Sequence, residues 1–332
     1  PAGFLLTASH SDSPCFRLRD HAELTGEYIR LSAERYGGMI NDSWMDRPLS
    51  VAGRVLVRRE GGLEARLVDL KRDVALIPRV AIHLNRETNS GVKYDPARDL
   101  VALYAAGTGS GSFYREVART ADCAPEDVVA GDLVLYNNQP GTVWGPEGEF
   151  VSAPRLDDLA CVFACTEGFL TAQERDMVPV LCVFDNEEIG SETKQGAASV
   201  FLPETLAAIS EALGLSAVDH RALLADSMML SCDNGHARHP NHPELADTNE
   251  APVPNGGVVV KHSPRYATDG VSAAVFTELC RRAEVPVQHY ANRPDQMGGA
   301  TLGNIADTKL PIPTVDIGMA QLAMHSCFET MG

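Results

Sequence analysis

The stretch Val178-Pro-Val-Leu-Cys-Val-Phe-Asp-Asn-Glu-Glu-Ile-Gly-Ser191 carries the main features of this chain. A run of core residues as long as one strand leads into three acidic residues and a glycine turn, and such a run is typical of a buried strand. Clustered carboxylates repel one another when ionised, so a divalent cation would resolve the repulsion and leave one carboxylate as a general base. On the local sequence alone, a solvated acidic loop is an equal alternative.

Four other apolar, β-prone runs also end before a residue that can bind metal. They are Phe4 to Ala8 before His10, Val151 to Pro154 before Asp157, Ser227 to Cys232 before Asp233, and Thr314 to Ile317 before His325. Ligands collect at the carboxyl ends of strands in α/β sheets, so we expect these residues to converge. Apolar residues at helical spacing lie between the runs, at 159–170, 197–213 and 271–283. The alternation predicts an α/β domain whose mostly parallel sheet is covered on both faces.

The segment from Trp44 to Phe150 has a different character. Its short valine- and leucine-rich pieces are separated by glycine and proline turns. This pattern predicts a β-rich domain of residues 44–150, inserted into a discontinuous catalytic domain of residues 1–43 and 151–332. Gly107 to Phe113 faintly resembles a dinucleotide-binding loop, but Ser112 replaces the third glycine, so we interpret the segment as a flexible loop.

Composition argues against several functions. Lysine and arginine total 28 against 45 aspartates and glutamates, a formal net charge of −17, so neither nucleic acid nor a membrane is an expected partner. The eight cysteines are scattered without a CxxC pair, as expected of reduced, mostly buried thiols. No apolar stretch approaches the roughly 18 to 20 residues of a membrane span. We therefore predict a cytoplasmic protein.

Both ends of the chain have the features of a truncation. The sequence opens without methionine on an apolar run, and it stops at Met331-Gly332 inside a predicted starting helix. A signal peptide could precede this start, so the predicted location depends on cysteine usage alone.

Two candidate ligands have plain structural alternatives. His10 fits a metal ligand, and Asp12, two residues later, fits the carboxylate that fixes its tautomer. A hydrogen-bonded surface histidine is an equal alternative for His10. Asp157 can bridge two cations through its two oxygens. Aspartates at a helix N-terminus more often serve the dipole or the cap, and we give that role to Asp158.

The segment from Asp233 to His242 contains three histidines at His-x-x-His-x-x-His spacing. Because Pro240 interrupts any regular helical face, we prefer Asp233 as the ligand and place His236 and His239 outside the first ligand shell or beside the substrate. The complete candidate set for a two-metal site with one acid left over as base is His10, Asp157, Glu187, Glu188, Asp233 and His325. Zinc, manganese or cobalt would suit these ligands.

Five motifs, in order along the chain, resemble those of the aspartyl aminopeptidase family. They are His10-Ser-Asp-Ser-Pro, Ala153-Pro-Arg-Leu-Asp-Asp-Leu159, Asp185-Asn-Glu-Glu-Ile-Gly-Ser191, Asp233-Asn-Gly-His-Ala-Arg-His-Pro-Asn241 and Gln321-Leu-Ala-Met-His-Ser326. The resemblance spans essentially the whole chain. It implies a catalytic α/β domain of the phosphorylase/hydrolase-like zinc exopeptidase type with an inserted dimerisation domain, assembled as a hollow tetrahedral dodecamer.

The resemblance also implies residue roles. Asp157 would bridge two divalent ions, most simply zinc, with His10 and Asp233 completing one site and Glu188 with His325 the other. Glu187 would be the general base, and we count Asp12, which orients His10, among the catalytic residues. His83 would lie in the dimerisation domain and reach a neighbouring subunit's active site; without the resemblance it would be a packed strand histidine.

The implied reaction is release of N-terminal aspartate or glutamate from peptides. Lys261 is the leading candidate for the cation that recognises the acidic side chain, and Tyr266 follows it on the substrate side. An exposed salt bridge is the alternative for Lys261. Gly298 and Gly299 would let the backbone approach the substrate, although a plain turn fits them nearly as well.

Two other classes of function remain open. One is a two-metal aminopeptidase or deacylase of different specificity. The other is a catalytically silent metal-binding scaffold, which the intact Glu187 argues against. A panel of substrates tests the first of these alternatives.

Overall fold

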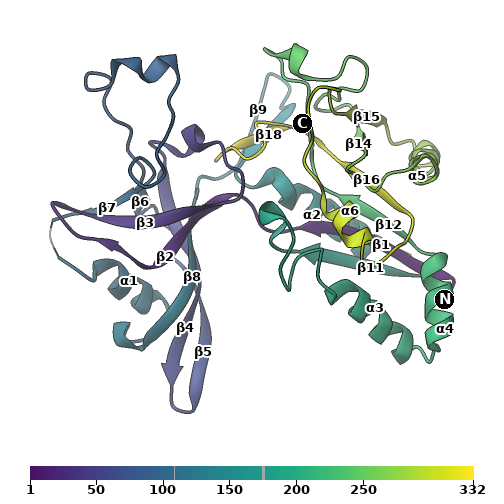
Figure 1. The fold of residues 1–332 in the computed structure, drawn as a ribbon, viewed down its shortest axis with the longest axis horizontal. Coiled ribbons are helices and arrows are strands. Elements are labelled where there is room, and N and C mark those ends of the chain that lie inside the picture. Colours follow the sequence, from purple (N-terminus) through teal and green to yellow (C-terminus); the bar gives the residue numbers. More distant parts are fainter. Residues whose placement is uncertain (108, 174–175) are drawn as a thin grey trace. The chain divides into compact units, whose positions relative to one another are not determined.

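The computed structural model describes residues 1–107, 109–173 and 176–332. Contacts divide the chain into two compact units. The unit that we call the α/β unit contains Pro1–Ser13, Gly141–Met324 and Glu329–Gly332, and the β unit contains Pro14–Pro140 and His325–Phe328. The sequence predicted domain boundaries near residues 44 and 150, and these units divide at other residues. Figure 1 labels their elements along the chain.

A mostly parallel six-stranded sheet forms the centre of the α/β unit, as predicted. Its order is β11-β1-β12-β16-β14-β15. The strands are β1 (Gly3–His10), β11 (Met177–Phe184), β12 (Met228–Cys232), β14 (Val258–His262), β15 (Val287–Ala291) and β16 (Thr314–Gly318). Only β14 and β16 pair antiparallel. Parallel strands align their carboxyl ends at one edge, which is where the candidate ligands follow.

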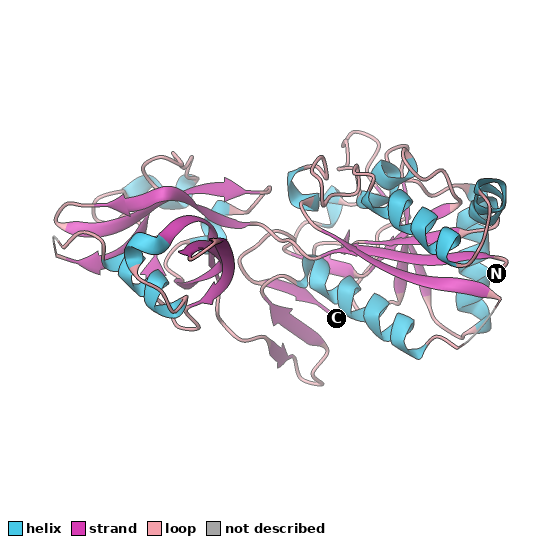
Figure 2. Ribbon diagram, turned by 90° about the horizontal axis from the view of Figure 1, so that it is seen from below, coloured by secondary structure: helices cyan, strands magenta, loops and turns pink. Residues whose placement is uncertain are grey.

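Helices pack on both faces of this sheet (Figure 2). They are α2 (Leu156–Thr171), α3 (Phe201–Ala212), α4 (Ala217–Ala225), α5 (Gly270–Arg282) and α6 (Leu302–Asp307). Leucines of α3, α4 and α6 form one apolar cluster with Phe4 and Leu6 of β1. Cysteines and Phe276 of α2 and α5 form a second cluster with Val260 and Val315. The two clusters are the two halves of an α/β core.

A second, five-stranded sheet has the order β13-β17-β18-β10-β9. It contains β9 (Thr142–Trp144), β10 (Phe150–Ala153), β13 (Gly235–His236), β17 (Ala320–Leu322) and β18 (Glu329–Met331). Asp157 therefore follows a strand outside the central sheet. The helix predicted at the end of the chain is wrong, because residues 329–331 pair with both β10 and β17 and bury Glu329 and Met331.

The β unit is built on a seven-stranded sheet of order β5-β4-β6-β7-β3-β2-β8, in which β8 also pairs with β4. Its strands are β2 (Cys15–Leu24), β3 (Tyr28–Tyr36), β4 (Pro48–Arg59), β5 (Gly62–Asp69), β6 (Ala75–Leu76), β7 (Ala102–Ala106) and β8 (Val128–Tyr136). The extra pairing closes the sheet into a barrel-like shape around an apolar core that includes Phe16 and Trp44. Helix α1 (Ser112–Thr120) follows the glycine-rich loop, whose Thr108 lies outside the described residues.

Within the described ranges, no single helix is long and apolar enough to cross a membrane. Helices α3 and α4, taken together, have the length and composition of a membrane span, but the pair is bent by 119°. Leucines of both helices lie buried in the core cluster that they share with β1.

Candidate metal centre

Four buried side chains converge at the carboxyl edge of the central sheet. His10 is the last residue of β1, Asp233 directly follows β12, and Asp157 and Asp158 lie at the start of α2. Each of the four offers one ligand atom, and these atoms all lie within 4.8 Å of one another. His10, Asp157 and Asp158 are at most 3% exposed. Of the residues expected to converge, His10, Asp157 and Asp233 lie together here, and Asp158 joins them.

The His10 ring is held with one nitrogen facing the carboxylates. Its Nε2 lies 3.5 Å from Asp157 Oδ1 and 3.9 Å from Asp233 Oδ1. Its Nδ1 lies 3.3 Å from Asp12 Oδ1 and 3.1 Å from the Asp12 carbonyl oxygen. A proton on Nδ1 would satisfy these acceptors and leave the Nε2 lone pair directed at the cluster, which is the tautomer that a metal ligand needs.

Asp12 also anchors the acidic loop after β11. The backbone N–H of Glu187 donates to its Oδ1 at 3.1 Å, and that of Glu188 donates to its Oδ2 at 3.2 Å. Residues 187–189 form a single 3-10 turn closed by Gly190 at φ 101°. One carboxylate therefore sets the positions of His10, Glu187 and Glu188 together.

The sequence reasoning did not place Asp158 in the cluster. The carboxylate predicted to serve the helix N-terminus instead accepts a hydrogen bond from the His10 N–H at 3.3 Å, and the side chain is fully buried. Burial and the charge of Asp233 raise the pKa of Asp158 well above its ordinary value. No local signal distinguished the two adjacent aspartates, because the distinguishing contact joins residues far apart in the sequence.

Asn234 and Glu329 are further polar residues that the sequence did not single out. The Asn234 amide donates to Gln321 Oε1 at 2.7 Å and to the Leu156 carbonyl at 3.0 Å, so it joins α2 to β17 next to the candidate ligand Asp233. Glu329, which is 1% exposed, accepts a hydrogen bond from the Asp157 N–H at 3.0 Å. Both residues fix the backbone beside a candidate ligand.

The electrostatics of this cluster fit a divalent cation. Burial and the neighbouring Asp233 raise the pKa of Glu187 to about 7. Burial lowers the pKa of His10, but its contacts with Asp12, Asp157 and Asp233 outweigh burial and raise it well above the ordinary value. A single imidazole surrounded by buried carboxylates leaves excess negative charge that a bound cation would neutralise. The donor set of one imidazole and several carboxylates suits zinc.

Lys261 lies beside the cluster and is almost fully buried. Its ammonium donates to the Asp233 carbonyl at 2.8 Å, lies 3.4 Å from Asp233 Oδ2, and sits 5.5 Å from the centre of the Tyr266 ring. Burial raises the pKa of Asp233, but Lys261 and His10 outweigh burial and lower it. Lys261 is therefore not in an exposed salt bridge.

Four of the six predicted substrate-side residues line one polar pocket of about 310 Å³ in the α/β unit. His236, His239, Gly298 and Gly299 line it, together with Tyr290 and Arg293. An added Cβ on Gly298 would lie 2.2 Å from Asn292 Nδ2, so the Asn292 side chain would have to move to admit a larger residue. The role of Gly298 and Gly299 beside the substrate stays a prediction. Lys261 does not line this pocket.

His83 and His325 belong to the β unit. His83 lies in an exposed turn between β6 and β7. The Nδ1 atom of His325 lies 2.8 Å from the Gly38 carbonyl, and the Ile40 N–H donates to the His325 carbonyl at 3.0 Å. Their proposed roles toward the metal centre remain predictions.

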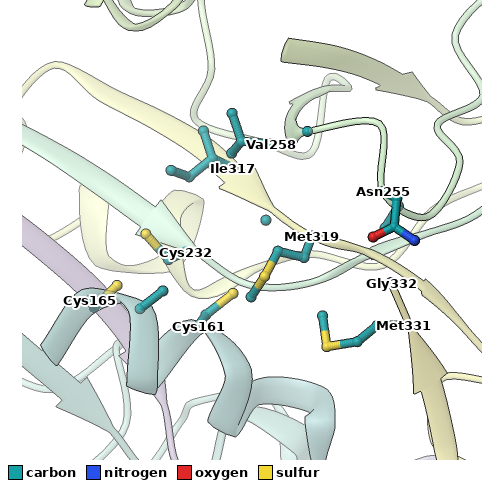
Figure 3. A pocket seen from close by; sticks show the side chains of 13 residues that line it. Cys161, Cys165, Cys232, Asn255, Val258, Ile317, Met319, Met331 and Gly332 are labelled. Atoms are coloured by element: carbon teal, nitrogen blue, oxygen red, sulfur yellow. The ribbon is translucent and has the colours of Figure 1, made fainter. Parts of the chain in front are cut away.

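A second, apolar pocket of about 400 Å³ lies between α2 and the strands β14 and β16. Figure 3 shows Cys161, Cys165, Cys232 and Met319 around it. All eight cysteines lie in the described residues, and six of them are buried, in agreement with the prediction of mostly buried thiols.

A buried histidine and carboxylate cluster at the carboxyl edge of a parallel sheet is an arrangement used by metal-dependent hydrolases. Residues 1–332 match the sequence model of the family described as aminopeptidase I zinc metalloprotease (M18). The chain therefore belongs to the M18 family and is a metallo-aminopeptidase.

Individual relatives agree with this assignment. A probable M18 family aminopeptidase 2 of Clostridium acetobutylicum is 42% identical over 342 residues, covering 99% of this chain and 78% of that protein. The protein of the same name from Mycobacterium leprae is 40% identical and covers 100% and 79%. The crystal structure of yeast aminopeptidase 1 (Ape1) is 30% identical, with a TM-score of 0.84, and covers 100% of this chain and 76% of that chain.

Proposed function

We propose that this aminopeptidase releases acidic residues from the N-termini of peptides and that Glu187 is its general base. The single observation that best supports a hydrolytic site is the buried cluster of His10, Asp157, Asp158 and Asp233, with Asp12 holding both the His10 ring and the Glu187 backbone. The proposal of acid specificity rests on the resemblance of the ordered motifs to those of the aspartyl aminopeptidase family.

His10, Asp157 and Asp233 would hold one ion. Glu188 and His325 are the predicted further ligands of a second. When bound, the ions would supply a water of lowered pKa and a Lewis acid for the peptide carbonyl. Glu187 removes the proton of the attacking water and returns a proton to the departing amine. Asp12 keeps the Glu187 backbone in place while its own carboxylate orients His10.

The Glu187→Gln variant tests the general base. Because the amide keeps the shape but cannot accept the proton, we expect turnover to fall about a thousand-fold, while metal content by elemental analysis stays at the wild-type level. Glu192→Gln changes an exposed residue of the same loop and is the matched control. Turnover of Glu187→Gln within a few-fold of wild type would remove Glu187 from the mechanism.

Lys261 is the proposed cation for the acidic side chain. Its ammonium lies at the candidate metal cluster, where the first residue of a bound peptide would be held, and burial strengthens its attraction for a carboxylate. The pocket histidines His236 and His239 are the alternative, because they line the polar pocket and Lys261 does not.

The ratio of kcat/KM for aspartyl over leucyl amides decides between these two sources of specificity. A ratio within one enzyme is insensitive to partial metal occupancy. We expect Lys261→Met to lower the ratio at least about ten-fold and His239→Gln to leave it within about two-fold. The reverse pattern would assign the acid specificity to the pocket histidines.

We also propose self-association through the β unit, with dimers building a dodecamer, and a cytoplasmic location. A solved structure 30% identical to this chain carries the description of an S. cerevisiae mApe1 dodecamer. The location is supported by the scattered cysteines of the sequence, which contain no CxxC pair. Light scattering of the purified protein tests the assembly, and a mass of one or two chains would refute the dodecamer.

A further inference from the structure

Asp316 is a fully buried carboxylate in the middle of β16 that the mechanism above does not use. Its Oδ1 accepts hydrogen bonds from the hydroxyls of Ser231 and Thr301, both at 2.7 Å. Its Oδ2 accepts from the Ala267 N–H at 2.6 Å, and its own N–H donates to Thr268 Oγ1 at 2.8 Å. The carboxylate thus joins segments that are far apart in the sequence.

Two of these segments adjoin the polar pocket. Thr301 lies two residues after Gly299, which lines the pocket, and is the N-cap of α6. Ala267 directly follows Tyr266, whose ring lies against Lys261. The two segments also contact each other, since Arg265 Nη1 donates to the Gly298 carbonyl at 3.2 Å. Asp316 is therefore the common anchor of residues 265–268 and of the pocket wall at 298–301.

The residues around Asp316 leave just enough space for these hydrogen bonds. An added Cβ on Gly303 would lie 2.5 Å from Asp316 Oδ1 and 2.5 Å from Ser231 Oγ, so the first turn of α6 approaches the carboxylate only because that residue is glycine. The negative charge also acts on Lys261: burial lowers the pKa of this lysine, and Asp233 and Asp316 together raise it. The charges of Asp233 and Asp316 therefore both favour the protonated form of Lys261.

We propose that Asp316 is a positioning residue for substrate binding: its carboxylate fixes the Tyr266 segment and the Gly298–Gly299 wall, and so sets KM rather than the chemical step. This inference rests on the proposed function only in assigning the polar pocket to the peptide. Ser231, in contrast, is already held by the β12–β16 pairing, in which it is the partner of Asp316.

Two hydroxyl donors to the same oxygen give a matched test. Thr301→Val removes the donor on the pocket wall, and Ser231→Ala removes the donor on the sheet. Both hydrogen bonds are 2.7 Å long. We expect Thr301→Val to raise KM about ten-fold, as for the loss of one hydrogen bond to a charged group, with kcat within about three-fold. Ser231→Ala should leave KM within about two-fold, and Thr301→Ser, which keeps the hydroxyl, should restore it.

Hydrogen exchange of the full chain gives a readout that is independent of turnover. In Thr301→Val and Asp316→Asn, amides of residues 263–269 and 296–301 should exchange at least about ten-fold faster, while those of β12 stay protected and metal content is unchanged. Unchanged exchange and KM in both variants, or an equal effect of Ser231→Ala, would overturn the proposal. If the wild-type enzyme prefers a neutral substrate, KM on that substrate and the exchange data still test Asp316, so the two failures are distinguishable.

Discussion

Removing the Asp12 carboxylate should weaken metal binding without unfolding the protein. In Asp12→Ala the His10 ring loses a partner 3.3 Å from Nδ1, and the N–H groups of Glu187 and Glu188 lose acceptors at 3.1 and 3.2 Å. The remaining acceptor of the ring, the Asp12 carbonyl oxygen at 3.1 Å, belongs to the backbone and stays. The ring is therefore less well oriented, but it is still held.

The magnitude follows from the kind of partner that is lost. Carboxylates that orient a metal-binding histidine typically contribute 10- to 100-fold to metal affinity, which is about 1.4 to 2.7 kcal/mol. The Asp12 side chain is 7% exposed, so water can reach part of the vacated space and the cost to folding should stay near the low end of about 1 to 3 kcal/mol for each lost acceptor.

The assay is a zinc titration in competition with a chromophoric chelator, with thermal melting of the same samples. Asp185→Ala is the matched control, since Asp185 directly follows β11, the strand that pairs with β1, and its carboxylate contacts Asn186 and Gln195. We expect Asp12→Ala to lose 10- to 100-fold in affinity and Asp185→Ala to lose less than about three-fold. Wild-type zinc affinity in Asp12→Ala, or an equal loss in the control, would refute the role of Asp12.

Three further predictions follow from the same structure. Gly196→Ala should destabilise the protein by about 1 to 3 kcal/mol, measured by urea unfolding, because its Cβ would lie 2.0 Å from the Ser191 carbonyl oxygen. Gly168→Ala, in helix α2 with open space around the added Cβ, should instead stabilise by about 0.5 to 1 kcal/mol; a stabilising Gly196→Ala would contradict the packing. Chelation should lower the melting temperature and zinc should restore it, since zinc at about 1,000 times its Kd adds about 4 kcal/mol; equal melting with and without chelator would argue against a buried metal centre.

The sequence predicted the strand ends of the site because each ligand follows its own apolar run. His10 after β1 and Asp233 after β12 needed only the rule that parallel strands align their carboxyl ends. For Asp158 the sequence favours the helix terminus, which is the commoner place for such an aspartate. Its contact with the His10 N–H is not visible in any local pattern, because the two residues are 148 positions apart. The anchoring role of Asp316 was invisible for the same reason.

The division into units was harder to predict than the strands. The strands β2 and β3 belong to the seven-stranded sheet although they precede the expected boundary at residue 44. The β unit begins at Pro14. This residue stands inside the motif His10-Ser-Asp-Ser-Pro, which the sequence analysis interprets as part of the metal site and not as a boundary between units. His325 contacts the Gly38 carbonyl and the Ile40 N–H within the β unit, and its role as a metal ligand stays a prediction.

Hydrolysis of aspartyl, glutamyl and leucyl chromogenic amides by the purified protein, measured before chelation, after chelation and after zinc is restored, tests the proposed activity most directly. We expect metal-dependent release from the aspartyl and glutamyl substrates and little from the leucyl substrate. A preference for leucyl amide would contradict the proposed specificity while leaving the metal centre intact, and activity that survives complete metal removal would contradict the metal centre itself.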